Sequence, residues 1–190
     1  MHDIEAAILD GCLKQDTRSE YALYKKCFRP LMAICFRYTR SEDNASELMN
    51  KGFLKILQNL NKYDRTRPFD KWAKRIMVNT IVDEFRANKK QRELIENIDM
   101  NDLNTSFHPV NLNAAESHFS AEDIQRYLAK VPEASRVVLN LYAFDGLSHK
   151  EIAERLNISE GTSKWHVSNA RSILKRFLAN ALTSLKSYVL

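Results

Sequence analysis

Residues 160 to 176 carry polar groups that can read the edge of a DNA base, spaced so that they share one side of a helix. The polar stripe consists of Lys164, Trp165, Ser168, Asn169 and Ser172. The apolar stripe consists of Val167, Ala170, Leu174 and Phe177. Between Gly161 and Phe177 there are four basic residues and no acidic one, which suits a phosphate backbone. The pattern predicts that the polar stripe can enter a major groove.

Start and stop signals around this segment predict a helix-turn-helix. Ser148 and Glu151 form a capping box, so a first helix is expected to begin at residue 149. Asn157 tolerates the left-handed conformation that forms the turn, and Ser159 is a good N-cap for a second helix to about Phe177. The same pattern also fits an ordinary helical hairpin whose polar face is solvated, and this stretch by itself leaves both interpretations open.

The composition favours an all-α protein without a metal or cofactor. The 190 residues include only four glycines and four prolines, and the 44% that are hydrophobic recur at intervals of three and four. Cys12, Cys27 and Cys35 form no C-x-x-C pair and are expected to be small core residues. The histidines lack ligand spacing, and the chain has neither a phosphate-cradling glycine loop nor a nucleophile motif. We therefore expect no enzymatic activity.

The chain also lacks the signals of a membrane or exported protein. No apolar run approaches the length of a membrane span. The N-terminal residues include acids where a signal peptide needs basic side chains. We expect a cytoplasmic protein with no membrane insertion.

The distribution of charge predicts two domains and a connector. Residues 62 to 92 hold ten basic and four acidic side chains, whereas residues 93 to 123 hold seven acidic ones and no Lys or Arg. The expected organisation is a helical domain over 1–92, a flexible acidic linker over 93–120 and the helix-turn-helix domain over 121–190. In the first domain the apolar spacing predicts helices over 3–15, 18–39, 44–60 and 70–90.

Three sequence runs resemble bacterial sigma factors of the extracytoplasmic-function (ECF) group. GLSHKEIAERLNISEGTSKWHVSNAR is similar to their promoter −35 reading domain, although Asn157 replaces a glycine and Ser163 replaces a buried valine. NASELMNKGFLKIL and YDRTRPFDKWAKRIMVNTIVDEFRANKK resemble the domain that binds core RNA polymerase and reads the −10 element. The runs occur in the family's order and are separated by a linker of plausible length.

The resemblance implies three sets of site residues. The −35 element would be contacted by Thr162, Lys164, Trp165, Ser168, Asn169, Arg171 and Ser172. The −10 element would be contacted by Tyr63, Arg65, Lys74, Asn79 and Arg86, with the flipped base against the loop from Tyr63 to Phe69. Core polymerase would be bound by Asn44, Glu47, Asn50, Lys51 and Lys55. Leu48, Phe53, Phe69 and Trp72 are expected to be core residues.

The implied function is transcription initiation, in which the protein binds core RNA polymerase and directs it to promoters through the −10 and −35 elements. Its expected partners are core polymerase and promoter DNA, and the resemblance leaves room for an anti-sigma factor. The alternative is a helix-turn-helix regulator that binds DNA without joining polymerase. That alternative explains the second domain but gives no role to the RPFxxW and RIxxN segments of the first.

Overall fold

The computed structural model describes residues 4–93 and 121–187, with side chains omitted for 89–93, 121–124 and 180–187. The predicted linker lies almost wholly outside the described residues. The chain divides into two compact units, Met1–Gln91 (unit 1) and Arg92–Leu190 (unit 2). All regular elements in the described ranges are helices, which confirms the predicted all-α fold. None of the described helices is long and apolar enough to cross a membrane.

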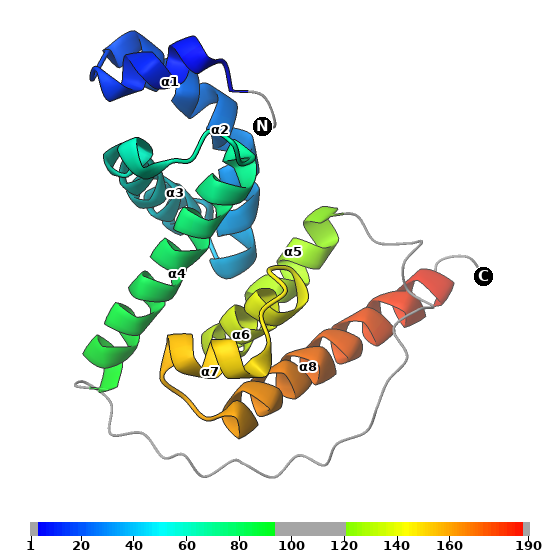
Figure 1. Ribbon diagram of the computed structural model, residues 1–190. Coiled ribbons are helices and arrows are strands. Elements are labelled where there is room, and N and C mark those ends of the chain that lie inside the picture. The colour runs from blue at the N-terminus through cyan, green and yellow to red at the C-terminus, as the bar shows by residue number, and fades with distance from the viewer. Residues whose placement is uncertain (1–3, 94–120, 188–190) are drawn as a thin grey trace. The chain divides into compact units, whose positions relative to one another are not determined.

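The described part of unit 1 contains four α-helices and a short 3-10 helix (Figure 1). They are α1 (Ala6–Leu13), α2 (Thr17–Tyr38), α3 (Glu42–Gln58), η1 (Leu60–Lys62) and α4 (Phe69–Glu93). The start of α3 was predicted two residues too late. Ser41 is its N-cap and accepts a hydrogen bond from the Asn44 amide at 3.2 Å. Glu42 and Asp43 therefore belong to the first turn, where negative charge complements the helix dipole.

The core of unit 1 is built from fully buried side chains of α2, α3 and α4. Its largest members are Leu23, Leu31, Met49, Ile56 and Met77. Gly52 of α3 leaves room for the Met77 side chain of α4, because a Cβ atom there would lie 2.3 Å from the Met77 Cε atom. Leu48, Phe53 and Phe69 are also buried, as predicted, while Trp72 is only half-buried.

The three cysteines are buried, as predicted. Burial raises the pKa of Cys12 to about 11 and that of Cys27 and Cys35 to about 12. Because a thiol reacts through its thiolate, these side chains act as small apolar core residues.

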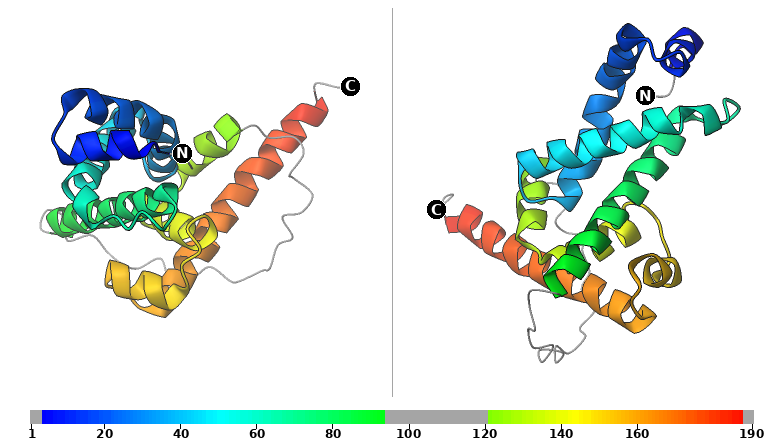
Figure 2. Two further views of the ribbon diagram at one scale, coloured as in Figure 1. Left: turned by 45° about the horizontal axis from the view of Figure 1, so that its top comes forward. Right: turned by 90° about the vertical axis from the view of Figure 1, so that its left-hand side faces the viewer.

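Unit 2 contains α5 (Ala121–Lys130), α6 (Glu133–Ala143), α7 (His149–Leu156) and α8 (Glu160–Ser187). Both views in Figure 2 show α8 as one continuous helix. It extends past its predicted end near Phe177 to Ser187, because the intervening sequence contains no glycine or proline to stop it. Val167 and Ala170, from the predicted apolar stripe, are buried, and Leu174 and Phe177 are half-buried.

A buried arginine joins α5 to α6, which the sequence did not predict. Arg136 is only 2% exposed, and its guanidinium donates to the carbonyl oxygens of Val131 at 3.1 Å and Ala129 at 3.4 Å. These carbonyls lie at the C-terminal end of α5, where backbone acceptors lack partners within the helix. Arg136 therefore fixes the entry of the chain into α6.

The turn between α7 and α8 has the predicted geometry. The Ser148 amide donates to Glu151 Oε2 at 2.8 Å, and the Glu151 amide donates to Ser148 Oγ at 3.2 Å, which completes the capping box. Asn157 ends α7 in the left-handed conformation, with φ 52° and ψ 55°. The Ile158 amide then donates to the Ala153 carbonyl at 3.1 Å. This turn sets the direction in which α8 leaves α7.

Asn157→Ala is expected to lower the free energy of unfolding of unit 2 by about 1 kcal/mol, because the left-handed conformation is less favourable for alanine than for asparagine. Asn157→Gly is the matched control and should retain or slightly raise stability. Urea unfolding can be followed through Trp165 fluorescence in a Trp72→Phe background, which leaves one tryptophan in the chain. Equal stabilities of the Ala and Gly variants would contradict the role given to the backbone conformation.

Candidate nucleic-acid interface

The N-terminal end of α8 presents capped backbone amides and exposed cations. The Thr162 amide donates to Ser159 Oγ at 2.9 Å, and the two hydroxyl groups lie 2.8 Å apart, which confirms Ser159 as the N-cap. Lys164, Arg171 and Ser172 are exposed, and Thr162 is half-exposed. The positive end of the helix dipole and these side chains together favour an approaching phosphate.

Three residues of the predicted polar stripe are less exposed than expected. Trp165, Ser168 and Asn169 are half-buried, so the expectation that they stand open beside Lys164 is wrong for these three. The Asn169 amide nitrogen donates to Ser135 Oγ of α6 at 3.1 Å. The physical reason is that α8 packs along α6 over a wider face than its apolar stripe covers. The proposed DNA contacts of these residues stay predictions.

Trp165 lies across the edge of this packed face. Its ring is 5.0 Å from that of His166 at an interplanar angle of 72°. Its indole nitrogen is buried and has no hydrogen-bond acceptor within the described part of the chain. An unpaired buried donor is costly, so this nitrogen lowers the gain from packing the indole ring here.

A histidine of α7 supports the first turns of α8, and no sequence pattern predicted this contact. His149 Nδ1 lies 3.0 Å from the hydroxyl oxygen of Ser163, whose side chain is completely buried. The His149 ring stacks on Tyr142 at 4.5 Å, and the Arg171 guanidinium lies 5.7 Å from the centre of the same tyrosine ring. The buried hydroxyl that replaces the family's valine is therefore hydrogen-bonded, as a buried polar group requires.

The loop between η1 and α4 is held by its own residues. The Tyr63 hydroxyl donates to the Arg67 carbonyl at 2.6 Å, and burial raises the pKa of Tyr63, so this donor stays protonated. Tyr63 packs against Phe69 and Trp72, with ring centres 5.2 and 5.0 Å away. The segment from Asp64 to Pro68 is exposed. The result is a preformed turn with a partly open aromatic edge.

The other predicted −10 contacts lie within this loop and along α4. Arg65 is exposed in the loop and forms an ion pair with Asp10 of α1. On α4, Asn79 and Arg86 are exposed, whereas Lys74 is half-buried. The structure thus brings aromatic surface and positive charge together in unit 1, which is the combination that holds unstacked bases.

The predicted polymerase-binding face of α3 is only partly open. Asn44, Glu47 and Asn50 are exposed, and Asn50 Oδ1 accepts a hydrogen bond from the Tyr24 hydroxyl at 3.2 Å. Lys51 is exposed and Lys55 is half-buried, and their ammonium groups lie against two carboxylates of α4.

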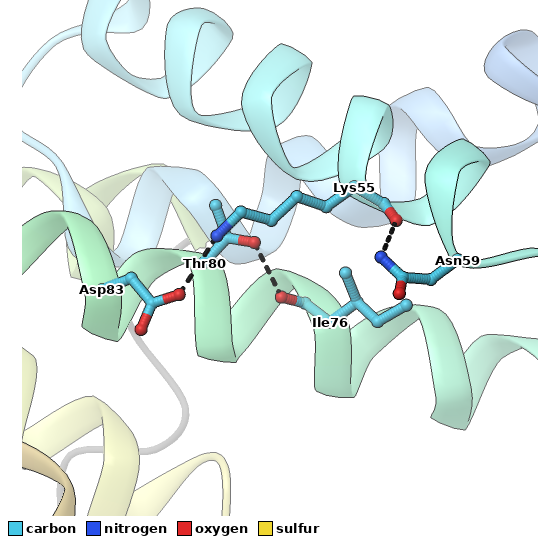
Figure 3. A network of polar contacts seen from close by, with 5 residues as sticks. All are labelled: Lys55, Asn59, Ile76, Thr80 and Asp83. Atoms are coloured by element: carbon cyan, nitrogen blue, oxygen red, sulfur yellow. Dashed lines mark hydrogen bonds and ion pairs between the residues drawn. The ribbon is translucent and has the colours of Figure 1, made fainter. Parts of the chain in front are cut away.

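Both lysines bridge α3 to α4. Lys51 Nζ lies 2.8 Å from Glu84 and 2.8 Å from Glu47, and these carboxylates raise its pKa. Lys55 Nζ lies 3.0 Å from Asp83, while its carbonyl accepts from the Asn59 side chain at 2.8 Å (Figure 3). Exposed pairs of this kind contribute little to stability individually. They do fix the direction of both lysine side chains.

The described residues bring no group of three or more His, Cys, Asp or Glu side chains together that could hold a metal ion.

Comparison with known proteins assigns both units. Residues 23–91 match the Sigma-70 region 2 family, and residues 121–174 match Sigma-70, region 4. The RNA polymerase sigma factor SigZ of Bacillus subtilis is 30% identical over 159 residues, covering 82% of this chain and 85% of that protein. The protein belongs to the ECF group of sigma factors. It is therefore a transcription initiation factor that acts with core RNA polymerase on promoter DNA.

A second relative agrees with membership of the ECF group, and one solved structure is also similar. The ECF RNA polymerase sigma factor SigW of Bacillus subtilis is 27% identical, covering 76% of this chain and 81% of that protein. The sigma factor RpoE of Bartonella quintana, solved with the anti-sigma factor NepR, is similar with 18% identity and a TM-score of 0.49, covering 84% of this chain and 96% of that one. A regulator that never joins polymerase would not account for the region 2 match in this ECF sigma factor.

Acidification is expected to destabilise unit 2 through His149. Burial, and then the charges of Lys164 and Arg171, lower the pKa of His149 below its ordinary value of 6.5. The folded state therefore binds fewer protons than the unfolded state, so the stability is complete above about pH 6.5 and falls as the pH decreases through that value. Urea unfolding of unit 2, followed by Trp165 fluorescence, should show a lower midpoint at pH 5.5 than at pH 7.5.

His149→Gln should reduce this pH difference, because glutamine cannot titrate. Measurements at pH 5.5 keep the Glu151 capping carboxylate ionised, since its pKa lies below 4.5. An unchanged pH dependence in the variant would assign the effect to other groups.

Proposed function

We propose that three surfaces of this sigma factor divide the work of initiation. Unit 2 reads the −35 element through α8, the loop and α4 of unit 1 read the −10 element, and the outer face of α3 binds core polymerase. The observation that carries this proposal is the α7–α8 geometry, in which a capped helix presents Lys164 and Arg171 with no acidic residue between Gly161 and Phe177. Such a helix fits the charge and dimensions of a major groove.

In the proposed −35 complex, the residues of α8 differ in what they can reach. Lys164 is exposed one turn into the helix, where side chains can reach base edges. Thr162 and the helix N-terminus suit a backbone phosphate. Arg171 and Ser172 are exposed two turns further on. Asn169 would have to exchange its hydrogen bond with Ser135 for one to DNA, so we expect it to contribute less than its position alone suggests.

In the proposed −10 complex, an unstacked base packs on the open edge of the Tyr63 aromatic cluster. Stacking on aromatic side chains accepts any base, so discrimination requires a hydrogen bond to a base edge. Asn79 can supply it from the exposed side of α4. Arg65, Lys74 and Arg86 would hold the phosphates on either side of the base.

For polymerase, Asn44, Glu47 and Asn50 offer an exposed polar row on α3. Lys51 and Lys55 would support this row indirectly. Their bonds to Glu84 and Asp83 hold α3 against α4, the helix that carries Asn79. Polymerase binding and −10 reading would then depend on one rigid pair of helices.

The protein would act in the cytoplasm, where polymerase and the chromosome meet, and would contribute recognition rather than catalysis. Its membership of a family of initiation factors supports this proposal. The direct test is to purify the chain with core polymerase and map the genomic DNA that is retained. Promoter DNA that binds equally well without core polymerase would contradict the proposal.

Lys164→Ala and Lys175→Ala should affect −35 recognition differently. Both lysines are exposed on α8, but Lys175 lies about three turns further along the helix, where phosphate is the expected neighbour. Lys164→Ala should cost about 1 to 3 kcal/mol on the best −35 sequence and less on mismatched ones. Lys175→Ala should weaken all sequences alike and reduce the slope of log affinity against log salt by about one.

The measurement is the affinity of the polymerase complex for a −35 library at several salt concentrations. The two lysine variants control for each other, since both remove one positive charge from the same helix. Uniform weakening by Lys164→Ala, together with a changed sequence ranking for Lys175→Ala, would mean that α8 docks in another orientation.

Asn79→Ala should preserve polymerase binding but impair promoter opening, because the lost contact is made to an unstacked base. Asn88→Ala is a control nine positions along α4, which places it on the opposite side of the helix. Opening can be followed by permanganate reactivity of unpaired thymines. Pre-melted promoter DNA should restore part of the loss. Normal opening on duplex DNA would remove the role assigned to Asn79.

A further inference from the structure

The shape of the −10 loop does not depend on the Arg65 side chain. Asp64 Oδ1 accepts hydrogen bonds from the Thr66 amide at 3.0 Å and the Thr66 hydroxyl at 2.7 Å. Its other oxygen lies 3.4 Å from the Arg67 Nε atom. Together with the Tyr63 hydroxyl bond to the Arg67 carbonyl, these contacts close the turn from within. The guanidinium of Arg65 is therefore available to a group outside the loop.

That group is Asp10 of α1, which is 55 residues distant in the sequence. The carboxylate of Asp10 accepts a hydrogen bond from the Arg65 Nη2 atom. Burial of Leu9 and Cys12 fixes the rotation of α1, and an ion pair of 3.1 Å joins Glu5 to Lys26 of α2. The position of Asp10 beside the loop is thus set by the packing of α1. The Sigma-70 region 2 match begins at residue 23 and does not include this helix.

The stability of α1 does not explain why residue 10 is an aspartate. Asp10 lies in the last turn of the helix, which has no basic residue. The C-terminal end of a helix dipole is negative, so a carboxylate there is unfavourable. A carboxylate and a phosphate present similar paired oxygens to a guanidinium. Asp10 therefore presents to Arg65 the same chemistry as a nucleic-acid phosphate.

We propose that Asp10 is a positioning residue that occupies Arg65 in the free protein and gives it up to a backbone phosphate of single-stranded promoter DNA. The proposal rests on the −10 role proposed above for the loop. Because Arg65 must leave Asp10 before it binds phosphate, α1 lowers the affinity of the loop for DNA in general. A strand that also places a base against Tyr63 and Asn79 overcomes this competition, whereas one held by phosphate contacts alone does not.

The test measures binding of a fluorescein-labelled 20-nucleotide single strand of mixed sequence to the full chain assembled with core polymerase. Core polymerase alone gives the baseline. Asp10→Asn should tighten binding by roughly two- to five-fold at low salt, the range that corresponds to one exposed ion pair. This gain should shrink as salt rises, because salt weakens the competing pair in the parent protein. Asp10→Glu keeps the charge and should restore the parental affinity.

Arg65→Gln should weaken binding and reduce the salt slope by about 0.7, as expected for one phosphate contact on a single strand. Adding Asp10→Asn to Arg65→Gln should then have no further effect, since Asp10 acts only through Arg65. Glu5→Gln is the matched control, because it removes a negative charge from the same segment at a pair remote from the loop. It should leave the affinity unchanged.

The outcomes separate this inference from the function on which it rests. If Arg65→Gln weakens binding but Asp10→Asn does not tighten it, the inference is wrong and the −10 role of the loop stands. The same conclusion follows if Asp10→Asn tightens binding equally with and without Arg65, or as much as Glu5→Gln does. If Arg65→Gln has no effect at all, the inference fails together with the −10 role proposed for Arg65, whereas the roles proposed for Tyr63 and Asn79 are tested separately by Asn79→Ala.

Discussion

Burial of one side of α8 against α6 decides which side chains this sigma factor can offer to DNA. Val167 and Ala170 are excluded from solvent, and the polar groups next to them are drawn into the same contact. Ser135, itself buried, bonds to both His166 and Asn169 and so extends the packed face beyond its apolar residues. The side of α8 that stays exposed is a narrower strip that begins at Lys164. A recognition helix is therefore defined by its packing as much as by its polar residues.

The two departures from the family pattern in the helix-turn-helix are both accommodated locally. Asn157 takes the left-handed conformation usually left to glycine, which asparagine tolerates better than most residues. Ser163 fills a completely buried position and places its hydroxyl against His149, which stacks on Tyr142. The polar network replaces an apolar contact between the two helices. Its consequence is that a titratable group, His149, lies beside the cations of the proposed DNA-binding surface.

In unit 1, acidic side chains form ion pairs with basic side chains and so set the direction in which the cationic groups point. Lys51 and Lys55 are held by Glu84 and Asp83, and Arg65 is held by Asp10. Each pair is partly exposed, so each is weak enough for a polymerase surface or a DNA phosphate to compete with it. These three cationic side chains are thus oriented before any partner binds. Orientation of this kind reduces the side-chain ordering that binding would otherwise require.

The sequence by itself determined the features that depend on neighbouring residues. The capping box of Ser148 and Glu151, the turn at Asn157 and the cap at Ser159 were all predicted, because each involves side chains and amides within a few positions. The burial of the cysteines and of Leu48 and Phe53 followed from helical periodicity. Family membership followed from motifs in a fixed order.

Only the tertiary structure decided how polar side chains are paired across helices. Asn169 and Ser135 are 34 residues apart, and Arg65 and Asp10 are 55 apart. Helical periodicity gives the side of a helix on which a residue lies, but not which other helix faces it or at what angle. A stripe that looks solvated on a single helix can therefore be half-covered once that helix packs, as α8 is by α6. The directions of Lys51, Lys55 and Arg65 depend on carboxylates that the fold brings from distant parts of the chain.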